Sequence, residues 1–408
     1  MLLIIGGASA IGFYMAWSIG ANDVANSMAT AVGAKAITFK QAVLIAGVLN
    51  FIGAVFVGPH VVETVKGGII DSAFIPDGHT LMLGFIASLL AAALWVTLST
   101  WKEMPISTTH SVIGALIGFG LIVGGVQTVH WGKVGSVAAS WVLSPVFGCI
   151  LAFLIFKLLV KLIFAQDNPV HSAKIVGPII IGVTAFLIVS SLLLKTALSE
   201  MMGISTLSQS IIISGIISII VVFLSIYLLR NIEGRSSEDY ATVEGIFRKL
   251  QVITSCYVAF SHGANDVANA IGPVAAIVPL ASTGEMNPTA AIPTYLLVLG
   301  GIGIAVGCMT WGRKVMQTVG GRITSLTNTR GFSVDFGAAT TVLVASKLGL
   351  PISTSHTVVG AVIGVGLARG LEAVDLGIIR KIIISWLLTL PIAAATSIGI
   401  FLVIRLFI

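Results

Sequence analysis

The sequence predicts an all-α polytopic membrane protein with about twelve transmembrane segments in two inverted repeats. Three observations carry this prediction: the composition is apolar, the apolar residues form long runs, and two polar motifs each occur twice. Of the 408 residues, 56% are hydrophobic and only 9% are charged, whereas a soluble domain has about a quarter charged residues. A water-soluble fold of this length could not cover its surface with so few charges, so the chain is expected to cross a membrane repeatedly.

Charge and cysteine content exclude other classes. The net charge is +6, but Lys and Arg lie in short clusters between apolar runs, without the basic stripe of a nucleic-acid-binding protein. The three cysteines, Cys149, Cys256 and Cys308, are widely spaced in apolar segments. Neither a disulfide framework nor a cysteine metal site is therefore expected.

The apolar runs define the segments. They cover roughly 2–32, 40–62, 80–100, 105–125, 133–164, 175–194, 204–230, 251–280, 290–310, 332–350, 351–368 and 376–407. A spanning helix needs about 20 apolar residues. The fourth and eleventh runs are short and rich in Gly, Ser and Thr, so we expect broken or re-entrant helices there.

The basic residues between the runs predict the orientation. Lys35 and Lys40 follow the first run, and further Lys and Arg gather in 230–250, 311–331 and 369–381. Such connections favour the cytoplasmic side. Twelve crossings then place both termini outside the cell membrane.

Two motif pairs show that the chain is duplicated. GANDVANS begins at Gly20 and GANDVANA at Gly263, 243 residues later, with seven of eight letters identical. PISTTHSVIGALIGFG begins at Pro105 and PISTSHTVVGAVIGVG at Pro351, 246 residues later, with eleven of sixteen identical. We call Gly20–Asn26 and Gly263–Asn269 the GANDVAN motifs, and Pro105–His110 and Pro351–His356 the PIST segments. Two pairs in one order at nearly one offset indicate an internal repeat.

The two repeats are expected to be inverted. We assign residues 1–165 to the first repeat, 251–408 to the second, and 166–250 to connecting helices and a cytoplasmic linker. The loop after the first GANDVAN motif is basic, whereas the loop after the second has no Lys or Arg. Equivalent loops therefore prefer opposite faces. Inverted repeats are typical of secondary transporters, with sites near mid-membrane on discontinuous helices.

The GANDVAN motifs suit a small cation. An ionised Asp at mid-bilayer costs on the order of 3 kcal/mol, so Asp23 and Asp266 must face the bundle interior and be matched by a cation or a proton. Gly20 and Gly263 permit unwound backbone, and the neighbouring Asn side chains offer oxygen ligands. A helix cap or an interhelical hydrogen bond is the alternative.

The PIST segments suit an oxyanion. Each proline is followed by three hydroxyl residues, and hydroxyls with free N–H groups at a helix N-terminus can bind an anion. The alternative is that the hydroxyls bond back to their own helix. His110 and His356 could titrate or hold a phosphate oxygen, or could orient the turn. The glycine runs that follow are expected to be close-packing surfaces.

A charge argument joins the two kinds of motif. Neither pair contains Lys or Arg, so two carboxylates would repel a dianion unless cations enter with it. Cations bound at Asp23 and Asp266 would cancel that repulsion and attract the anion. The residues therefore predict cation-coupled oxyanion symport, without separating phosphate from sulfate.

These motifs resemble those of the inorganic phosphate transporter (PiT) family in its prokaryotic form. ETVKGGII from Glu63 and MQTVGGRITSLTNTRGFSVDF at 316–336 are similar to that family as well. The resemblance covers nearly the whole chain. It implies sodium-coupled uptake of inorganic phosphate by alternating access, a multi-pass protein of the cell or inner membrane, a homodimer, no cofactor besides the transported sodium, and no enzyme activity.

The resemblance also implies roles for individual residues. Phosphate would be bound by Asn26, Ser107, Thr108, Thr109, Asn269, Ser353, Thr354 and Ser355. Sodium would be bound by Asn22, Asp23, Asn265 and Asp266. Glu63 matches a glutamate tied to transport, and its counterpart in the other repeat is Asp335; His110 and His356 are accessory candidates.

Other functions are weighed against this one. A proton-coupled phosphate or sulfate permease of the same fold differs only in the coupling ion. An intramembrane aspartic protease would need its two carboxyl groups about 3 Å apart, and it has no use for the PIST segments. A channel is disfavoured by the two-repeat design.

Overall fold

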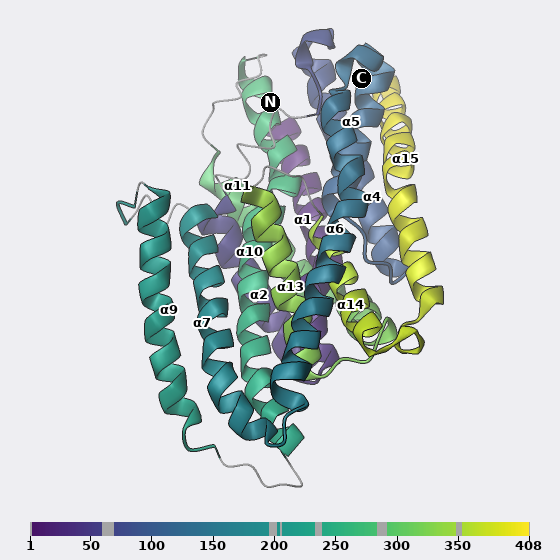
Figure 1. The fold of residues 1–408 in the computed structure, drawn as a ribbon. Helices are drawn as coiled ribbons and strands as arrows, with labels where there is room; N and C mark the ends of the chain where they lie inside the picture. The colour runs from purple at the N-terminus through teal and green to yellow at the C-terminus, as the bar shows by residue number, and fades with distance from the viewer. Residues whose placement is uncertain are drawn as a thin grey trace.

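The structure is a computed structural model that describes residues 2–58, 69–195, 202–204, 206–232, 239–283, 292–347 and 353–407. Within these residues the regular elements are helices, which confirms the all-α prediction (Figure 1). The α-helices are α1 (Leu2–Gly33), α2 (Phe39–Phe56), α4 (Gly78–Trp101), α5 (Thr108–Gly124), α6 (Trp131–Leu159), α7 (Pro169–Lys195), α9 (Leu207–Leu229), α10 (Asp239–Thr283), α11 (Thr294–Trp311), α12 (Arg313–Gln317), α13 (Asn328–Lys347), α14 (Thr354–Arg369) and α15 (Leu376–Phe407).

Nine of the described helices are long and apolar enough to cross a membrane: α1, α2, α4, α6, α7, α9, α10, α11 and α15. Helix α5 is apolar but has only 17 residues, and α14 has 16. Large apolar side chains on the outer helices are exposed, among them Leu154, Phe223 and Leu402. Such a surface is stable in lipid rather than in water, so the chain is a multi-pass membrane protein.

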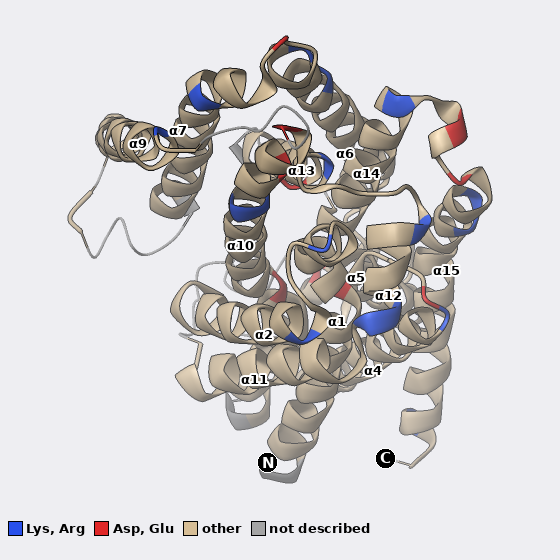
Figure 2. Cartoon of the chain, turned by 90° about the horizontal axis from the view of Figure 1, so that it is seen from below, with Lys and Arg blue, Asp and Glu red and all other residues tan. Residues whose placement is uncertain are grey.

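The termini lie at the same end of the helix bundle (Figure 1). Seen from the opposite end, Lys and Arg mark the helix ends and connections around α1, α10 and α12 (Figure 2). Basic connections on one face are what the positive-inside rule expects of a cytoplasmic face.

Helices α1 and α10 run without interruption through the two GANDVAN motifs. The expectation of unwound backbone at Gly20 and Gly263 is therefore wrong. These glycines instead allow close helix contact. A Cβ at Gly20 would overlap the Ile304 carbonyl of α11, and one at Gly263 would overlap the Asn50 carbonyl of α2. Small residues let membrane helices approach in this way.

Helices α5 and α14 begin inside the bundle. Ser107 and Ser353 are their N-caps, and each hydroxyl accepts a hydrogen bond from the backbone N–H three residues later at 3.3 Å. The side chains of Thr108 and Ser355, in the first turns of these helices, reach Asp23 in α1. Because α1 continues to Gly33, about 15 Å further at 1.5 Å per residue, these helix starts lie part-way along α1. Pro351 and Ile352 lie outside the described residues.

The packing of the helices repeats itself between the two halves. Helix α1 packs against α11, as α10 packs against α2, and α5 packs against α15, as α14 packs against α6. The glycine runs lie in these contacts, as predicted. A Cβ at Gly114 would come 2.7 Å from the Leu390 carbonyl oxygen, and one at Gly360 would overlap the Pro145 carbonyl oxygen. Gly360 lies 246 residues after Gly114, and Leu390 lies 245 residues after Pro145, so the two contacts are related by the internal repeat.

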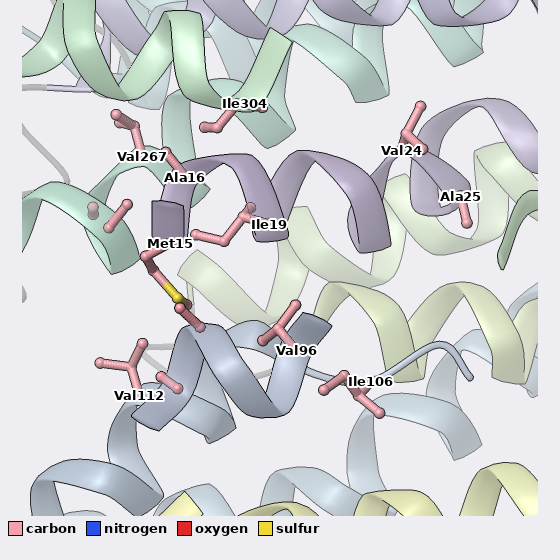
Figure 3. Packing of buried hydrophobic residues seen from close by; sticks show 14 of the residues in the cluster. Met15, Ala16, Ile19, Val24, Ala25, Val96, Ile106, Val112, Val267 and Ile304 are labelled. Carbon is pink, nitrogen blue, oxygen red and sulfur yellow. The ribbon is translucent and has the colours of Figure 1, made fainter. Parts of the chain in front are cut away.

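The core around α1 consists mainly of small and branched apolar side chains. Met15, Ala16 and Ile19 of α1 lie among Val96, Val112, Val267 and Ile304 of the surrounding helices (Figure 3). All are nearly inaccessible to solvent. This packing holds the GANDVAN motif of α1 in the middle of the bundle, next to the starts of α5 and α14.

The N-cap of α4 supports a pH-dependent stability prediction. Asp77 Oδ1 accepts a hydrogen bond from the Thr80 backbone N–H at 2.8 Å, and Oδ2 accepts one from the Thr80 hydroxyl at 2.9 Å. The backbone hydrogen bond, followed by the hydroxyl one, holds the pKa of Asp77 below its usual value of 3.8. We expect Asp77→Ala to lower the free energy of unfolding by about 1 kcal/mol at neutral pH.

The sign of the pH effect follows from the lowered pKa. A carboxylate whose pKa is lower in the folded state stabilises the fold above its unfolded pKa, and loses that effect as pH falls through the folded value. The thermal midpoints of wild type and Asp77→Ala in detergent should therefore converge as pH falls below about 4. Asp167→Ala, at an exposed loop position, is the control. A constant difference between wild type and Asp77→Ala down to the lowest pH at which both stay folded would contradict this.

Candidate functional site

Asp23 is the point where three helices meet. Its buried carboxylate accepts hydrogen bonds from Asn26 Nδ2 at 2.9 Å, Thr108 Oγ1 at 2.9 Å and Ser355 Oγ at 3.2 Å. Asn26 Nδ2 also lies 2.8 Å from Ser355 Oγ. One carboxylate of α1 therefore links a PIST hydroxyl from α5 to another from α14. The positive N-terminal ends of both helices favour a negative charge here.

The second acidic residue lies close to the first. Asp266, in α10, is 2% exposed, and Asp23 is 1% exposed, so both face the interior as expected. His262 lies between them: its Nε2 is 3.8 Å from Asp23 Oδ2 and in contact with Asp266 Oδ2. Asn269, one turn beyond Asp266, donates to Thr109 Oγ1 at 3.0 Å. The acids of both GANDVAN motifs and hydroxyls of both PIST segments thus form one cluster.

The two motif asparagines that precede the acids are not equivalent. Asn22 is buried and holds the connection between α4 and α5. Its Nδ2 donates to Thr100 Oγ1 at 2.9 Å and to the Met104 carbonyl at 3.0 Å, and its Oδ1 accepts from the Ile106 N–H at 3.2 Å. Asn265 is exposed and donates weakly to Asp266 Oδ1 at 3.3 Å. Asn22 therefore positions the first PIST segment, whereas the side chain of Asn265 stays exposed.

The six PIST hydroxyls divide into two groups. Ser107 and Ser353 cap their own helices, which matches the alternative of local bonding. Thr108, Thr109 and Ser355 instead reach residues of the GANDVAN motifs. Thr354 is half-buried. Thr108, Thr109 and Ser355 are therefore the hydroxyls that face the acidic cluster.

The two PIST histidines contact each other. The ring centres of His110 and His356 are 5.1 Å apart, edge to face. His356 stacks on Trp386 at 3.8 Å, and His110 Nε2 lies 3.4 Å from Ser140 Oγ. These contacts join the two PIST segments across the molecule. They favour the orienting role over direct contact with an anion.

Asp335 belongs to a separate cluster, and Glu63 lies outside the described residues. Asp335, on α13, accepts hydrogen bonds from Thr30 Oγ1 at 2.7 Å and from Ser255 Oγ at 2.8 Å. Thr30 is seven residues beyond Asp23 in α1, or about 10 Å along the helix. Asp335 therefore connects α1, α10 and α13 and does not contact Asp23 directly.

Comparison with known proteins identifies the family. A sequence model of the phosphate transporter family matches residues 19–397. The chain belongs to the phosphate transporter family. This confirms the resemblance noted from the motifs, and it places the chain in a family of transporters, not enzymes.

Individual relatives align with this transporter over almost its full length. A candidate phosphate permease of Thermococcus kodakarensis is 52% identical over 396 residues, covering 97% of this chain and 96% of the relative. The chloroplastic inorganic phosphate transporter 2-1 of Arabidopsis thaliana is 41% identical, covering 95% of this chain and 70% of the relative. A solved structure of a sodium-dependent phosphate transporter is 47% identical, with a TM-score of 0.89 and 100% coverage of both chains.

The sequence interpretation of this transporter missed His262 and Asn50. His262 immediately precedes the second GANDVAN motif, and the corresponding residue before the first motif is Ile19. His262 Nδ1 lies 3.0 Å from Asn50 Oδ1 of α2. A titratable residue that interrupts an otherwise repeated apolar position was the signal that could have revealed His262. Asn50 lies in no repeated motif, so only the fold brings it to the site.

Proposed function

We propose that this transporter couples inward movement of sodium to the uptake of inorganic phosphate, by alternating access of two inverted repeats. The sodium ions would bind at Asn22, Asp23, Asn265 and Asp266. The phosphate would bind to Asn26, Thr108, Thr109, Asn269, Thr354 and Ser355, with Ser107 and Ser353 holding the helix starts. One observation carries the proposal: Asp23 accepts hydrogen bonds from hydroxyls of both PIST segments.

That observation supports a coupling mechanism. A hydroxyl has only one hydrogen to donate, and Thr108 and Ser355 give theirs to Asp23. A sodium ion at Asp23 would satisfy the carboxylate and free both hydroxyls to donate to phosphate. Without sodium, the anion would face a carboxylate and occupied donors. Sodium binding would therefore create the phosphate site, which is what obligatory symport requires.

The charges around the cluster support the same assignment. Among the described residues, no Lys or Arg forms an ion pair with Asp23 or Asp266; the cationic candidate in contact with them is His262. Two buried carboxylates without a guanidinium or ammonium partner are costly. Two sodium ions would neutralise them and so remove the repulsion that a phosphate dianion would otherwise meet.

Phosphate is favoured over sulfate by hydrogen bonding. Phosphate keeps at least one O–H at neutral pH and can donate to an acceptor such as the Asn oxygens or a carboxylate. Sulfate has no hydrogen to donate there. A site with buried acceptors discriminates against a ligand that lacks the donor.

The direct test is uptake of radiolabelled phosphate into proteoliposomes that contain the purified transporter. We expect accumulation with an inward sodium gradient, and only background uptake with a potassium gradient at the same pH and clamped membrane potential. A tenfold excess of sulfate should leave uptake unchanged. Uptake driven equally well by a proton gradient without sodium would favour the proton-coupled permease.

The proposed repeats are residues 1–165 and 251–408, joined by 166–250. The mirrored helix contacts and the helix starts at Ser107 and Ser353 support twelve segments with re-entrant pairs at the PIST segments. The basic connections support termini outside the cell membrane. Single cysteines added at either terminus of a cysteine-free variant should then react with a membrane-impermeant maleimide in intact cells.

We also propose a homodimer, which the family resemblance implies. The mass of the detergent-solubilised transporter, measured by light scattering with the detergent subtracted, should equal two chains. A mass of one chain at all concentrations would exclude a stable dimer.

A further inference from the structure

We propose that Asp23, His262 and Asp266 form a binding site for a divalent transition-metal ion such as Zn²⁺, and that this ion competes with sodium. The competition rests on the proposed sodium site at the same carboxylates. The metal site itself rests only on the three side chains. It is an inhibitory site, since a tightly held divalent ion would keep sodium from the two acids.

The hydrogen bonds of Asn50 determine which nitrogen of His262 carries the hydrogen. Asn50 Nδ2 lies 2.8 Å from the Ala46 carbonyl oxygen. A carbonyl oxygen only accepts, so the amide nitrogen must be on that side and Asn50 Oδ1 on the other. Oδ1 lies 3.0 Å from His262 Nδ1, and it too only accepts. His262 Nδ1 is therefore the N–H donor, and in a neutral imidazole Nε2 carries a lone pair.

Nε2 faces the two carboxylates. His262 Nε2 is 3.8 Å from Asp23 Oδ2 and in contact with Asp266 Oδ2. One ligand atom from each of the three residues lies within 4.8 Å of the others. His262 Nε2 and Asp266 Oδ2 contact each other, and beyond that contact neither has a hydrogen-bond partner among the described residues. Two bare lone pairs at this contact would repel, so a proton lies between Nε2 and Oδ2 when no metal is bound, and a divalent cation would replace that proton.

The donor set selects the class of cation. One imidazole nitrogen and two carboxylate oxygens suit Zn²⁺, Cu²⁺ and similar ions, which take imidazole readily. Hard cations prefer oxygen alone. The charge also agrees, because two carboxylates and a neutral imidazole balance a divalent ion. In the other repeat Ile19 stands where His262 does, so we expect one such site per chain.

The first test is calorimetric titration of ZnCl₂ into the purified transporter in a choline buffer without sodium or phosphate. Wild type should bind one Zn²⁺ per chain. His262→Gln should weaken that binding at least tenfold. His171→Gln removes an exposed histidine of α7 and is the matched control, which should bind as wild type does. Equal binding by wild type and His262→Gln, or no binding by wild type, would overturn the proposal.

A second measurement needs no variant, in case His262→Gln does not fold. Cu²⁺ at one equivalent per chain should show electron spin echo modulation from the remote nitrogen of one coordinated imidazole. Labelling histidine with ¹⁵N should change that modulation. A spectrum without imidazole modulation would overturn the metal site. That is also the result expected if the three side chains bind only a proton.

The role of sodium is tested separately by displacement. NaCl should release Zn²⁺ from wild type, whereas choline chloride at the same ionic strength should not. His262-dependent Zn²⁺ binding that sodium does not displace would overturn the competition and the sodium assignment together, and would leave the metal site standing. Sodium-driven phosphate uptake by a wild type that binds no Zn²⁺ would overturn this proposal alone.

Discussion

Asp23→Asn is expected to abolish sodium-driven phosphate uptake while the transporter still folds. The substitution keeps the shape of the side chain and one oxygen that can accept from Thr108 or Ser355. It removes the charge that would hold sodium, and it places an NH₂ group against one of the donors that now face the carboxylate. Loss of a charged hydrogen-bonded partner of this kind is worth about 3 kcal/mol, which corresponds to roughly a 100-fold lower uptake.

The measurement is initial uptake of radiolabelled phosphate under an inward sodium gradient, at equal protein per vesicle. Phosphate uptake by Asp266→Asn should fall to a similar extent, because the Asp266 carboxylate contacts His262 in the same cluster. Asp167→Asn is the charge-matched control at an exposed position and should transport as wild type does. Size-exclusion chromatography in detergent establishes that each variant is folded. Wild-type sodium dependence in Asp23→Asn would show that this carboxylate does not bind the coupling ion.

From the sequence we could predict that the GANDVAN acids and the PIST hydroxyls lie in one region of the protein. We could not predict which acid contacts which hydroxyl. Inverted repeats place equivalent segments around one axis, so GANDVAN acids and PIST hydroxyls were expected near mid-membrane. That Asp23 contacts both Thr108 and Ser355 depends on how α5 and α14 pack on α1. No local pattern carries that information.

The wrong expectation at Gly20 and Gly263 has a related cause. A glycine beside polar residues in an apolar run fits two structures: an unwound helix that exposes carbonyls, or a continuous helix pressed against a neighbour. The deciding atoms are the carbonyls of Ile304 and Asn50, which lie far away in the sequence. The difference between buried Asn22 and exposed Asn265 has a similar origin. Asn22 is hydrogen-bonded to Met104 and Ile106 in the connection before α5, and these residues lie far from it in the sequence.

Gly360→Val is expected to prevent assembly of the folded transporter. An ideal Cβ at Gly360 would overlap the Pro145 carbonyl oxygen of α6, and that oxygen belongs to the main chain of a packed helix. Overpacking a core costs about 1–3 kcal/mol when side chains can shift. Here whole helices must separate, so we expect a larger cost and at least a tenfold lower yield of monodisperse protein. Gly399→Val, where a Cβ meets nothing within 4 Å, is the control.

The equivalent substitution in the first repeat, Gly114→Val, tests whether the two helix contacts are copies of each other. Gly114 of α5 meets the Leu390 carbonyl oxygen of α15, just as Gly360 of α14 meets that of Pro145 in α6. If the two helix pairs are copies of one contact, Gly114→Val should lower the yield as Gly360→Val does, and both alanine variants should be milder. These contacts position the N-terminal ends of α5 and α14 next to Asp23. An alanine variant that folds should therefore show a clear loss of phosphate uptake with only a small decrease in melting temperature. A Gly360→Val protein with the wild-type melting temperature would mean that α6 and α14 do not pack through this glycine.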